Sequence, residues 1–548
     1  MMNTIRNGIT ASLFFAIMTI ICMGSPARAA GECDGLPTAQ GPVSGVLDDK
    51  SGVCSFLGIP YAAAPVGELR FKKPLEHAPW TEPLATVKVG NQCPQQAGPM
   101  TDADIPMSED CLYLNVWQPA AARAGKKPVM VFIHGGGFVV GSGGNAAYNG
   151  ATLAKFGDVL VVTLNYRLSV PGFMAHPALV EAGLDAFNRG LFDQLAALKW
   201  VKSNIAGFGG DPENITLFGQ SAGGMSVGFH LVSPLDAGLF KNVGIHSAPA
   251  ILLNVGKDWA LAQGLEIAKR VGCADPATAL TCLVNTPAEK FLEAAPPGIF
   301  IMDDASLGDK FFYQPVIDGE FIPDAPYRLL KEGRFNSDAR VLILSTKDES
   351  SYFGLNKDLK TPEGFAATYS SDVKSIGRIF NLDFDIEPGK LAEVFSPSKF
   401  DSPKAAYDAF ITDTGFTCTA EIMAELISAR RPEVYRLFHA KSPFKIVANW
   451  GAFHGSELPF LFSNFSFMKQ NFRSKDNLAL SKKTIELWSS FAHTGVPRAE
   501  GAPELPKYDA STRAYLTLDD ELTLGSALKA DECKVVAEVF EKSFKQEP

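Results

Sequence analysis

A serine set among glycines is the segment of the chain best suited to do chemistry. The segment 219–224 reads Gly-Gln-Ser-Ala-Gly-Gly; it follows the apolar stretch 215–218 and precedes a stretch compatible with a helix through Leu231. A G-x-S-x-G pattern between a strand and a helix is typical of a nucleophilic serine on a sharp turn. Ser221 would stand at the helix N-terminus, whose positive dipole end favours an oxyanion. The pattern predicts that Ser221 attacks a carbonyl carbon.

A second glycine-rich segment lies upstream, where 134–138 reads His-Gly-Gly-Gly-Phe after another apolar stretch. Successive glycines let backbone N–H groups turn toward one point. We expect the N–H groups of Gly136 and Gly137, with that of Ala222, to form an oxyanion hole. The alternative is a phosphate-binding loop, but the sequence contains neither GxxxxGK[ST] nor GxGxxG.

These two segments need strands and helices to position them. Val/Ile/Leu-rich stretches at 128–133, 158–165 and 215–218 predict buried strands, the third broken by Gly219, and further strands are predicted at 340–345 and 434–439. Apolar residues recur at helical spacing over 190–205. Such strands separated by helices predict an α/β fold whose sheet is mostly parallel and buried on both faces. No linker or repeat divides the chain, so one large domain over residues 30–548 is expected.

The composition is that of a folded protein. Of 548 residues, 46% are hydrophobic and 20% are charged, which excludes a disordered or low-complexity chain. Lys and Arg number 50 and Asp and Glu number 60, so the formal net charge is −10. An acidic chain without a basic run lacks the clustered cations that bind phosphates. Nucleic acid is therefore not an expected partner.

The N-terminus has the parts of an export signal. Arg6 precedes an apolar run from Ile9 to Met23, and small residues flank Arg28 at the end of the segment. Residues 1–29 are predicted to be a signal peptide cleaved after Ala29. No later apolar run has the roughly 18 residues of a membrane-spanning helix, so no stable membrane insertion is expected. The mature protein is expected in the periplasm or outside the cell.

Export changes what the cysteines predict. Eight remain after the signal peptide is removed, and an even count in an oxidising compartment predicts disulfides. Metal binding is the alternative, but there is no CxxC pair and no neighbouring histidine, so no metal is expected. Many pairings are open; proximity favours Cys33–Cys54, Cys93–Cys111 and Cys273–Cys282, which leaves Cys418–Cys533 as a long closure.

Several longer motifs stand in a fixed order and make the chain resemble the type-B carboxylesterase family of α/β-hydrolases, which includes cholinesterases and bacterial p-nitrobenzyl esterases. The motifs are 56–62 (FLGIPYA), 109–117 (EDCLYLNVW), 165–168 (NYRL), 208–212 (FGGDP), 218–224 (FGQSAGG) and 315–319 (PVIDG). The resemblance covers nearly the whole mature chain. It implies an α/β-hydrolase fold with long insertions over the active site. It also implies the disulfides 93–111, 273–282 and 418–533, whereas the pair 33–54 rests on proximity alone.

The same resemblance supplies an acid. The segment 347–353 (KDESSYF) is similar to the K-D-E-G-x-x-F-like segment that carries the family's acid, so Glu349 is the expected carboxylate. Asp348 beside it is the rival, with a solvated turn as its alternative role. Ser350 replaces the usual glycine and makes the local turn a departure from the family pattern.

The base follows from the segment 453–460 (FHGSELPF), which is similar to the family segment that carries the catalytic histidine and so assigns that role to His454. The order Ser221, Glu349, His454 is the chain order expected of this fold. Neutral His454 would take the proton of Ser221, and ionised Glu349 would orient the imidazole. An acyl-enzyme intermediate follows, and no cofactor is required.

Two departures bear on the substrate. Gln220 stands where cholinesterases and many carboxylesterases carry Glu, and the 93–111 segment contains no aromatic residue that could stack on a choline. Both argue against a cholinesterase.

Ser247 matches a supporting serine of the family, and a plain helix-start residue is the alternative. The expected function is a secreted serine carboxylesterase acting on small-molecule esters. A lipase, a feruloyl, tannin-type or toxin-ester hydrolase, and a non-catalytic family member stay open, as does the oligomeric state.

Overall fold

The computed structural model describes residues 33–98, 101–119, 126–185, 187–295, 312–351, 357–387, 389–444, 449–467 and 470–545. The chain from Glu32 to Pro548 forms one compact unit. The predicted signal peptide, residues 1–29, lies outside the described residues, and the boundary after Ala29 stays a prediction.

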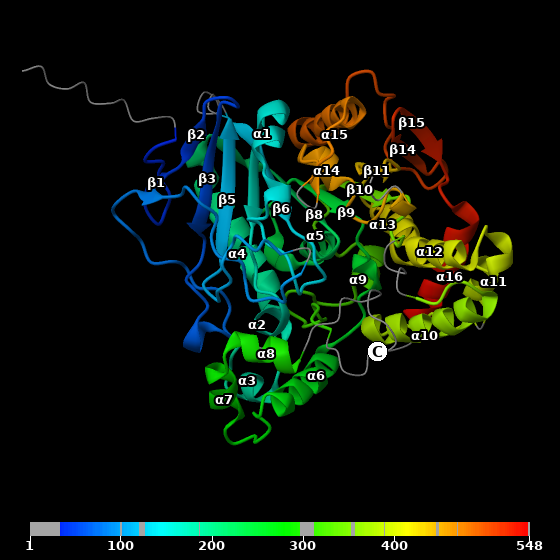
Figure 1. The fold of residues 1–548 in the computed structure, drawn as a ribbon, viewed down its shortest axis with the longest axis horizontal. Coiled ribbons are helices and arrows are strands. Elements are labelled where there is room, and N and C mark those ends of the chain that lie inside the picture. Colours follow the sequence, from blue (N-terminus) through cyan, green and yellow to red (C-terminus); the bar gives the residue numbers. More distant parts are fainter. Residues whose placement is uncertain are drawn as a thin grey trace, which may run out of the picture. The chain divides into compact units, whose positions relative to one another are not determined.

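An 11-stranded sheet runs through the centre of this unit, in the order β15-β14-β11-β10-β9-β8-β6-β7-β5-β3-β2 (Figure 1). Two short pairs, β1 with β4 and β12 with β13, lie apart from it. The strands are β1 Val43–Ser44, β2 Val46–Asp48, β3 Val53–Pro60, β4 Leu84–Ala85, β5 Tyr113–Pro119, β6 Lys127–Ile133, β7 Leu160–Leu164, β8 Gly210–Gln220, β9 Asn242–His246, β10 Arg340–Thr346, β11 Val434–His439, β12 Ser466–Phe467, β13 Gln470–Asn471, β14 Ala514–Leu518 and β15 Leu522–Ser526.

The middle of the large sheet is parallel. β7, β6, β8, β9, β10, β11 and β14 pair in parallel in that order, and only the two ends, β2-β3-β5-β7 and β14-β15, are antiparallel. Parallel neighbours require crossover connections, and helices supply them. The predicted α/β class is confirmed.

Helices cover both faces of the sheet, and each face has its own hydrophobic core. Side chains alternate along β6: Val129 and Val131 belong to one core, and Met130 and Phe132 belong to the other. The first core contains residues of α4, α5, α9 and α13, and the second contains residues of α1 and α15. The helices are α1 Ala151–Gly157, α2 Ser169–Phe173, α3 Pro177–Glu181, α4 Arg189–Asn204, α5 Ala222–Val232, α6 Lys257–Arg270, α7 Ala279–Asn285, α8 Ala288–Ala294, α9 Pro326–Glu332, α10 Pro362–Phe380, α11 Lys390–Val394, α12 Pro403–Thr412, α13 Cys418–Ser428, α14 Leu458–Leu461, α15 Lys475–Thr494 and α16 Ala530–Ser543.

The expectation that Gly219 breaks its strand is wrong. β8 continues through Gly219, which pairs with Ile133 of β6 and Ile245 of β9. A Cβ atom on residue 219 would lie 2.4 Å from the carbonyl oxygen of Gly223. Glycine is therefore required here for the close approach of α5, and the strand delivers the next residues directly to the turn that carries Ser221.

Four disulfides join the eight cysteines that follow the predicted signal peptide: Cys33–Cys54, Cys93–Cys111, Cys273–Cys282 and Cys418–Cys533. The last one connects the first residue of α13 to α16 across a sequence separation of 115 residues. Such pairs are compatible with an oxidising compartment.

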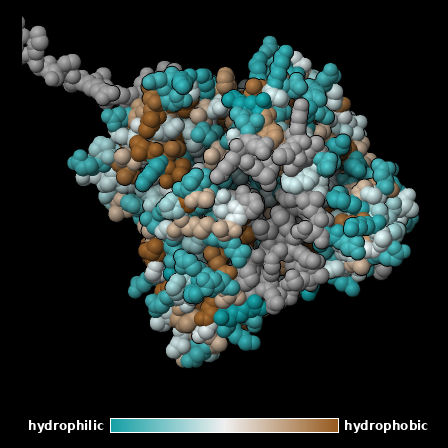
Figure 2. All heavy atoms as spheres, viewed as in Figure 1, coloured by the Kyte–Doolittle hydropathy of each residue, from teal (hydrophilic) through white to brown (hydrophobic). Residues whose placement is uncertain are grey.

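The surface of the unit is mixed. Figure 2 shows hydrophilic residues interspersed with hydrophobic ones, and the latter gather over the side that carries the N-terminal strands. The edge strand β2 contributes to the exposed apolar surface, since Val46 and Leu47 are 48% and 40% exposed. No helix within the described ranges is long and apolar enough to cross a membrane.

The long disulfide should contribute more to stability than the short one. Closing a loop of 115 residues removes about 5 kcal/mol of unfolded-state entropy, against about 3 kcal/mol for the 9-residue separation of Cys273 and Cys282. We expect the double substitution Cys418→Ser/Cys533→Ser to lower Tm more than Cys273→Ser/Cys282→Ser does. Thermal unfolding of both variants without reductant measures this, and the reverse order would contradict it.

Candidate active site

Ser221 stands on the turn between β8 and α5. Its backbone has φ 57° and ψ −125°, a conformation that residues other than glycine seldom adopt. Two hydrogen bonds hold it: its N–H donates to the carbonyl of His246 at 3.0 Å, and its own carbonyl accepts from the N–H of Met225 at 2.8 Å. The strained turn leaves the serine only partly buried, at the carboxyl end of the central strand.

The glycines after Ser221 are required by close backbone approach. A Cβ on residue 223 would lie 2.0 Å from the carbonyl oxygen of Ile133, and one on residue 224 would lie 2.7 Å from that of His246. The first turn of α5 can therefore pack directly on the ends of β6 and β9. The G-x-S-x-G spacing predicted from the sequence has this steric cause.

The glycine loop after β6 lies beside the serine. A Cβ on Gly135 would be 3.0 Å from Cβ of Ser221, and one on Gly136 would be 2.0 Å from the carbonyl oxygen of Val140. Gly136 and Gly137 have φ values of 110° and 62°, which glycine adopts without strain. The glycine loop and the serine turn are thus in direct contact.

The buried side chain of Gln95 connects this glycine loop to the segment closed by the Cys93–Cys111 disulfide. Oε1 of Gln95 accepts from the N–H of Gly141 at 2.7 Å, and its amide donates to the carbonyls of Gly141 and Cys93 at 2.9 and 3.0 Å. Gln95 was not singled out in the sequence, since nothing local marks it. It fixes the far end of the glycine loop.

His134, at the start of the glycine loop, is a structural residue. Burial lowers the pKa of its imidazole to about 4, so it is neutral at physiological pH. Its ring stacks on Tyr166 at 4.5 Å, and Nδ1 donates to the carbonyl of Gly135 at 2.7 Å. These contacts place His134 in the support of the glycine loop.

Glu349 follows β10 and its side chain is fully buried. Its Oε2 lies 2.6 Å from Nδ1 of His454. Its Oε1 accepts from the hydroxyl of Ser247 at 2.6 Å and from the N–H of Thr346 at 2.7 Å. These donors suit an ionised carboxylate, which can only accept hydrogen bonds. Ser247 therefore supports the acid and is not simply a helix-start residue.

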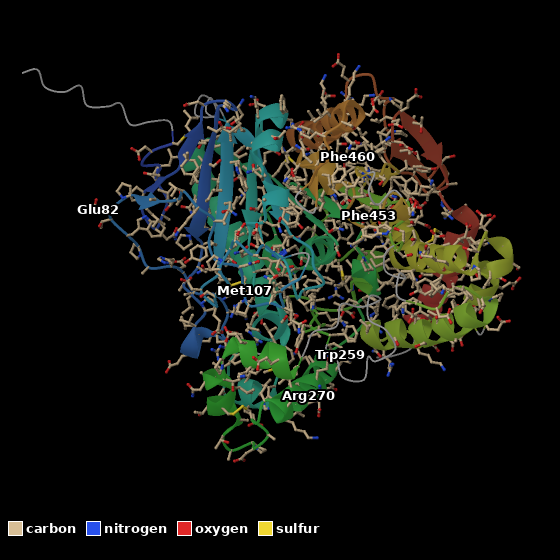
Figure 3. All side chains as sticks on the ribbon, viewed as in Figure 1. Glu82, Met107, Trp259, Arg270, Phe453 and Phe460 are labelled. Atoms are coloured by element: carbon tan, nitrogen blue, oxygen red, sulfur yellow. A yellow bond between two sulfur atoms is a disulfide. The ribbon has the colours of Figure 1, made fainter. Side chains whose placement is uncertain are left out.

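His454 lies in the loop between β11 and α14, and 8% of its side chain is exposed. Phe453 and Phe460, labelled in Figure 3, belong to this loop and to α14. The ring packs against Phe416 with 5.0 Å between centroids. Its Nε2 is 3.1 Å from the side-chain nitrogen of Gln220, the residue that precedes Ser221. The imidazole thus joins Glu349 to the serine turn.

Asp348, the rival carboxylate, points elsewhere. Its Oδ2 accepts from the N–H of Ala452 at 2.9 Å, and a Cβ on Gly451 would lie 2.2 Å from the same oxygen. Asp348 therefore fixes the backbone of the His454 loop, whereas Glu349 contacts the imidazole itself.

A second buried histidine–glutamate pair, His246 with Glu457, is one that the sequence did not predict. His246 Nδ1 lies 3.2 Å from Oε1 of Glu457, and both side chains are buried. Burial disfavours this carboxylate, but the hydrogen bond from His246 holds the pKa of Glu457 below its ordinary value. The pair links the end of β9 to the His454 loop. The only sequence signal was the place of Glu457 in the motif 453–460.

The structure brings the predicted residues to one edge of the sheet. Ser221, Glu349 and His454 all follow the carboxyl ends of parallel strands, and the glycine loop follows β6 at the same edge. Among the side chains that the structure describes, no three His, Cys, Asp or Glu residues form a group that could hold a metal ion.

Residues 33–536 match the profile of the family described as "Carboxylesterase family". The chain belongs to the carboxylesterase family. It is 35% identical over 500 residues to the para-nitrobenzyl esterase of Bacillus subtilis (strain 168), and the alignment covers 89% of this chain and 95% of that protein. It is 32% identical over 553 residues to the acylcarnitine hydrolase of Mus musculus, covering 96% and 95% of the two chains. It is 31% identical over 570 residues to the cholinesterase of Mus musculus, covering 97% and 91%.

A solved structure supports the same assignment. The chain is similar to a "PNB esterase" with a TM-score of 0.77 and 32% sequence identity, over 92% of this chain and 100% of that chain. The predicted α/β-hydrolase fold and the predicted family are confirmed. As a carboxylesterase with esterase relatives, the protein is a carboxylic ester hydrolase.

The hydroxyl of Ser247 should matter for activity. Ser247→Ala removes one donor from buried Glu349, and a hydrogen bond to a charged group is worth about 1.5–3 kcal/mol, or roughly a 10- to 100-fold loss in kcat/KM. Ser345→Ala is the matched control, because this buried hydroxyl makes no hydrogen bond within the described residues. Ester hydrolysis by both folded variants tests this; equal activities would show that Ser247 is dispensable.

Proposed function

We propose that this carboxylesterase is an exported enzyme that cleaves carboxylic esters with Ser221 as nucleophile, His454 as base and Glu349 as the acid that orients the base. One observation carries the proposal: a single imidazole touches buried Glu349 at 2.6 Å and the serine turn, through Gln220, at 3.1 Å.

The first half of the reaction forms an acyl-enzyme. As Oγ of Ser221 bonds to the ester carbonyl carbon, its proton passes to Nε2 of neutral His454 and the carbonyl electrons move to oxygen. Glu349 stabilises the imidazolium. We propose that the N–H groups of Gly136, Gly137 and Ala222 stabilise the oxyanion, each worth roughly 3–4 kcal/mol. The alcohol then leaves with the proton from Nε2, and the acyl group remains on the serine.

The second half reverses these roles with water. His454 takes a proton from water as the water oxygen attacks the acyl carbon, and then returns a proton to Oγ of Ser221 as the carboxylic acid leaves. In this proposal, Ser221 is the nucleophile, His454 is the base and Glu349 is the acid that orients the base in both halves of the reaction.

We further propose that the enzyme is exported and that its substrate is a small-molecule ester. Four disulfides fit a protein that folds in an oxidising compartment, and with the predicted signal peptide they support export to the periplasm or beyond. We propose residues 30–548 as one mature domain. The relatives named para-nitrobenzyl esterase and acylcarnitine hydrolase support a small-molecule ester as substrate.

Replacing the nucleophile should abolish turnover. Ser221→Ala is expected to lower kcat for p-nitrophenyl acetate by at least about 10³-fold, because only the hole and binding would remain. Rapid-mixing measurements of the hydrolysis of p-nitrophenyl acetate, butyrate, octanoate and palmitate test this. The dependence of the rate on acyl chain length also indicates how large an acyl group the site accepts. A fluorophosphonate should label the wild type at Ser221 and spare the variant. Substantial activity in folded Ser221→Ala would point to another nucleophile.

Replacing Glu349 should lower the rate of ester hydrolysis far more than replacing the neighbouring Asp348. Glu349→Gln is expected to lower kcat by about 10⁴-fold, because an amide favours the wrong imidazole tautomer. Asp348→Asn keeps an oxygen acceptor for the N–H of Ala452 and should cost less than about tenfold. Steady-state hydrolysis by both variants, with Tm as a folding control, distinguishes them. A larger loss in Asp348→Asn would transfer the acid's role to Asp348.

A further inference from the structure

Gln220 places its side-chain amide on the nitrogen of His454 that the proposed reaction needs. Nε2 of Gln220 lies 3.1 Å from Nε2 of His454, and only 5% of Gln220 is exposed. The sequence indicates only that Gln220 lacks the negative charge that would favour a cationic substrate. The contact with the imidazole bridges 234 residues of sequence and was not foreseen.

The two contacts of the ring fit a neutral imidazole with its hydrogen on Nδ1. Glu349 lies on Nδ1, so Nδ1 carries the hydrogen and donates it to the carboxylate. Nε2 then holds a lone pair and accepts a hydrogen bond from the Gln220 amide. A ring protonated on Nε2 would face this amide donor to donor, which is repulsive.

The other end of the amide is confined as well. A Cβ on Gly135 would lie 2.9 Å from Oε1 of Gln220, and one on Gly455 would lie 3.5 Å from its Nε2. The amide therefore sits between the glycine loop and the His454 loop.

We propose that Gln220 is a positioning residue that holds His454 as a neutral acceptor in the substrate-free enzyme, and that its lack of charge extends ester hydrolysis toward acidic pH. The proposal rests on the roles proposed above for Ser221 and His454. When Nε2 takes the proton of Ser221, the amide N–H must release Nε2; the contact favours the neutral ring over the protonated one.

The charged groups on the elements packed against the imidazole contact Nδ1 or are paired with other groups. Glu349, from β10, faces Nδ1 and favours a protonated ring. Glu457, on the His454 loop, is paired with His246 of β9, and Asp348 is bound to the backbone of Ala452. The π-helical turn Asp413–Thr417 presents Phe416 to the ring, while its buried Asp413 lies 3.5 Å from Lys529. Gln220 places a neutral amide on Nε2.

The test is the pH dependence of kcat/KM for p-nitrophenyl acetate in Gln220→Glu and Gln220→Leu. A carboxylate at this place favours the protonated ring, so the acid-side midpoint of Gln220→Glu should rise by about one pH unit or more. Gln220→Leu removes the donor without adding charge, so its midpoint should rise by less. The leucine variant also provides a test if a buried carboxylate prevents folding.

A matched control exists in the same chain. Oε1 of Gln194, on helix α4, lies 3.1 Å from Nε2 of His230, which is also a buried glutamine–histidine contact. Gln194→Glu should leave the pH midpoint unchanged, whatever it does to Tm. A shift in this control equal to that in Gln220→Glu would overturn the proposal, because the effect would then be a general one of added charge.

The remaining outcomes are distinct. Unchanged midpoints in both folded Gln220 variants, even with a lower plateau, would overturn the proposal and leave Gln220 a merely structural role. Activity in Ser221→Ala would instead overturn the proposed function on which it rests. A midpoint that rises in the order wild type, Gln220→Leu, Gln220→Glu, with the Ser221→Ala variant inactive, would support both.

Discussion

The hydrogen bond between buried Glu349 and His454 is the interaction on which the site depends. It joins the loop after β10 to the loop after β11, across 105 residues of sequence. A buried carboxylate is costly unless donors surround it, and Ser247, the N–H of Thr346 and the imidazole provide them. The same bond selects the imidazole tautomer, so one contact serves both the packing of the site and its proposed chemistry.

Around that bond, the site is built from backbone that approaches too closely for side chains. The turn at Ser221 is strained, and the glycines at 135, 219, 223 and 224 let β6, β8, β9 and the start of α5 meet at one edge. Strain of this kind persists only where the surroundings determine the conformation. Here two hydrophobic cores, one on each face of the sheet, hold the strands that converge on the turn.

The polar groups below the site form further links between the same strands. His246 accepts the N–H of Ser221 on its carbonyl and pairs with Glu457 through its ring, so it connects the serine turn to the His454 loop. Asp348 fixes the same loop from the other side. Each of these links joins segments that follow different strands, so together they hold the serine turn and the His454 loop in place.

The sequence by itself determined the strands near residues 128–133, 340–345 and 434–439, the serine turn and the glycine loop, because strand hydrophobicity and glycine spacing are local patterns. Long motifs also indicated the family, and with it the fold. The family motif already indicated Glu349 over Asp348, and the structure adds the contact of Glu349 with the imidazole. Only the tertiary structure decided that β8 runs through Gly219 and that Gln220 faces His454. These depend on contacts between residues far apart in the chain, and side-chain direction at a strand end is set by neighbouring strands and not by local sequence.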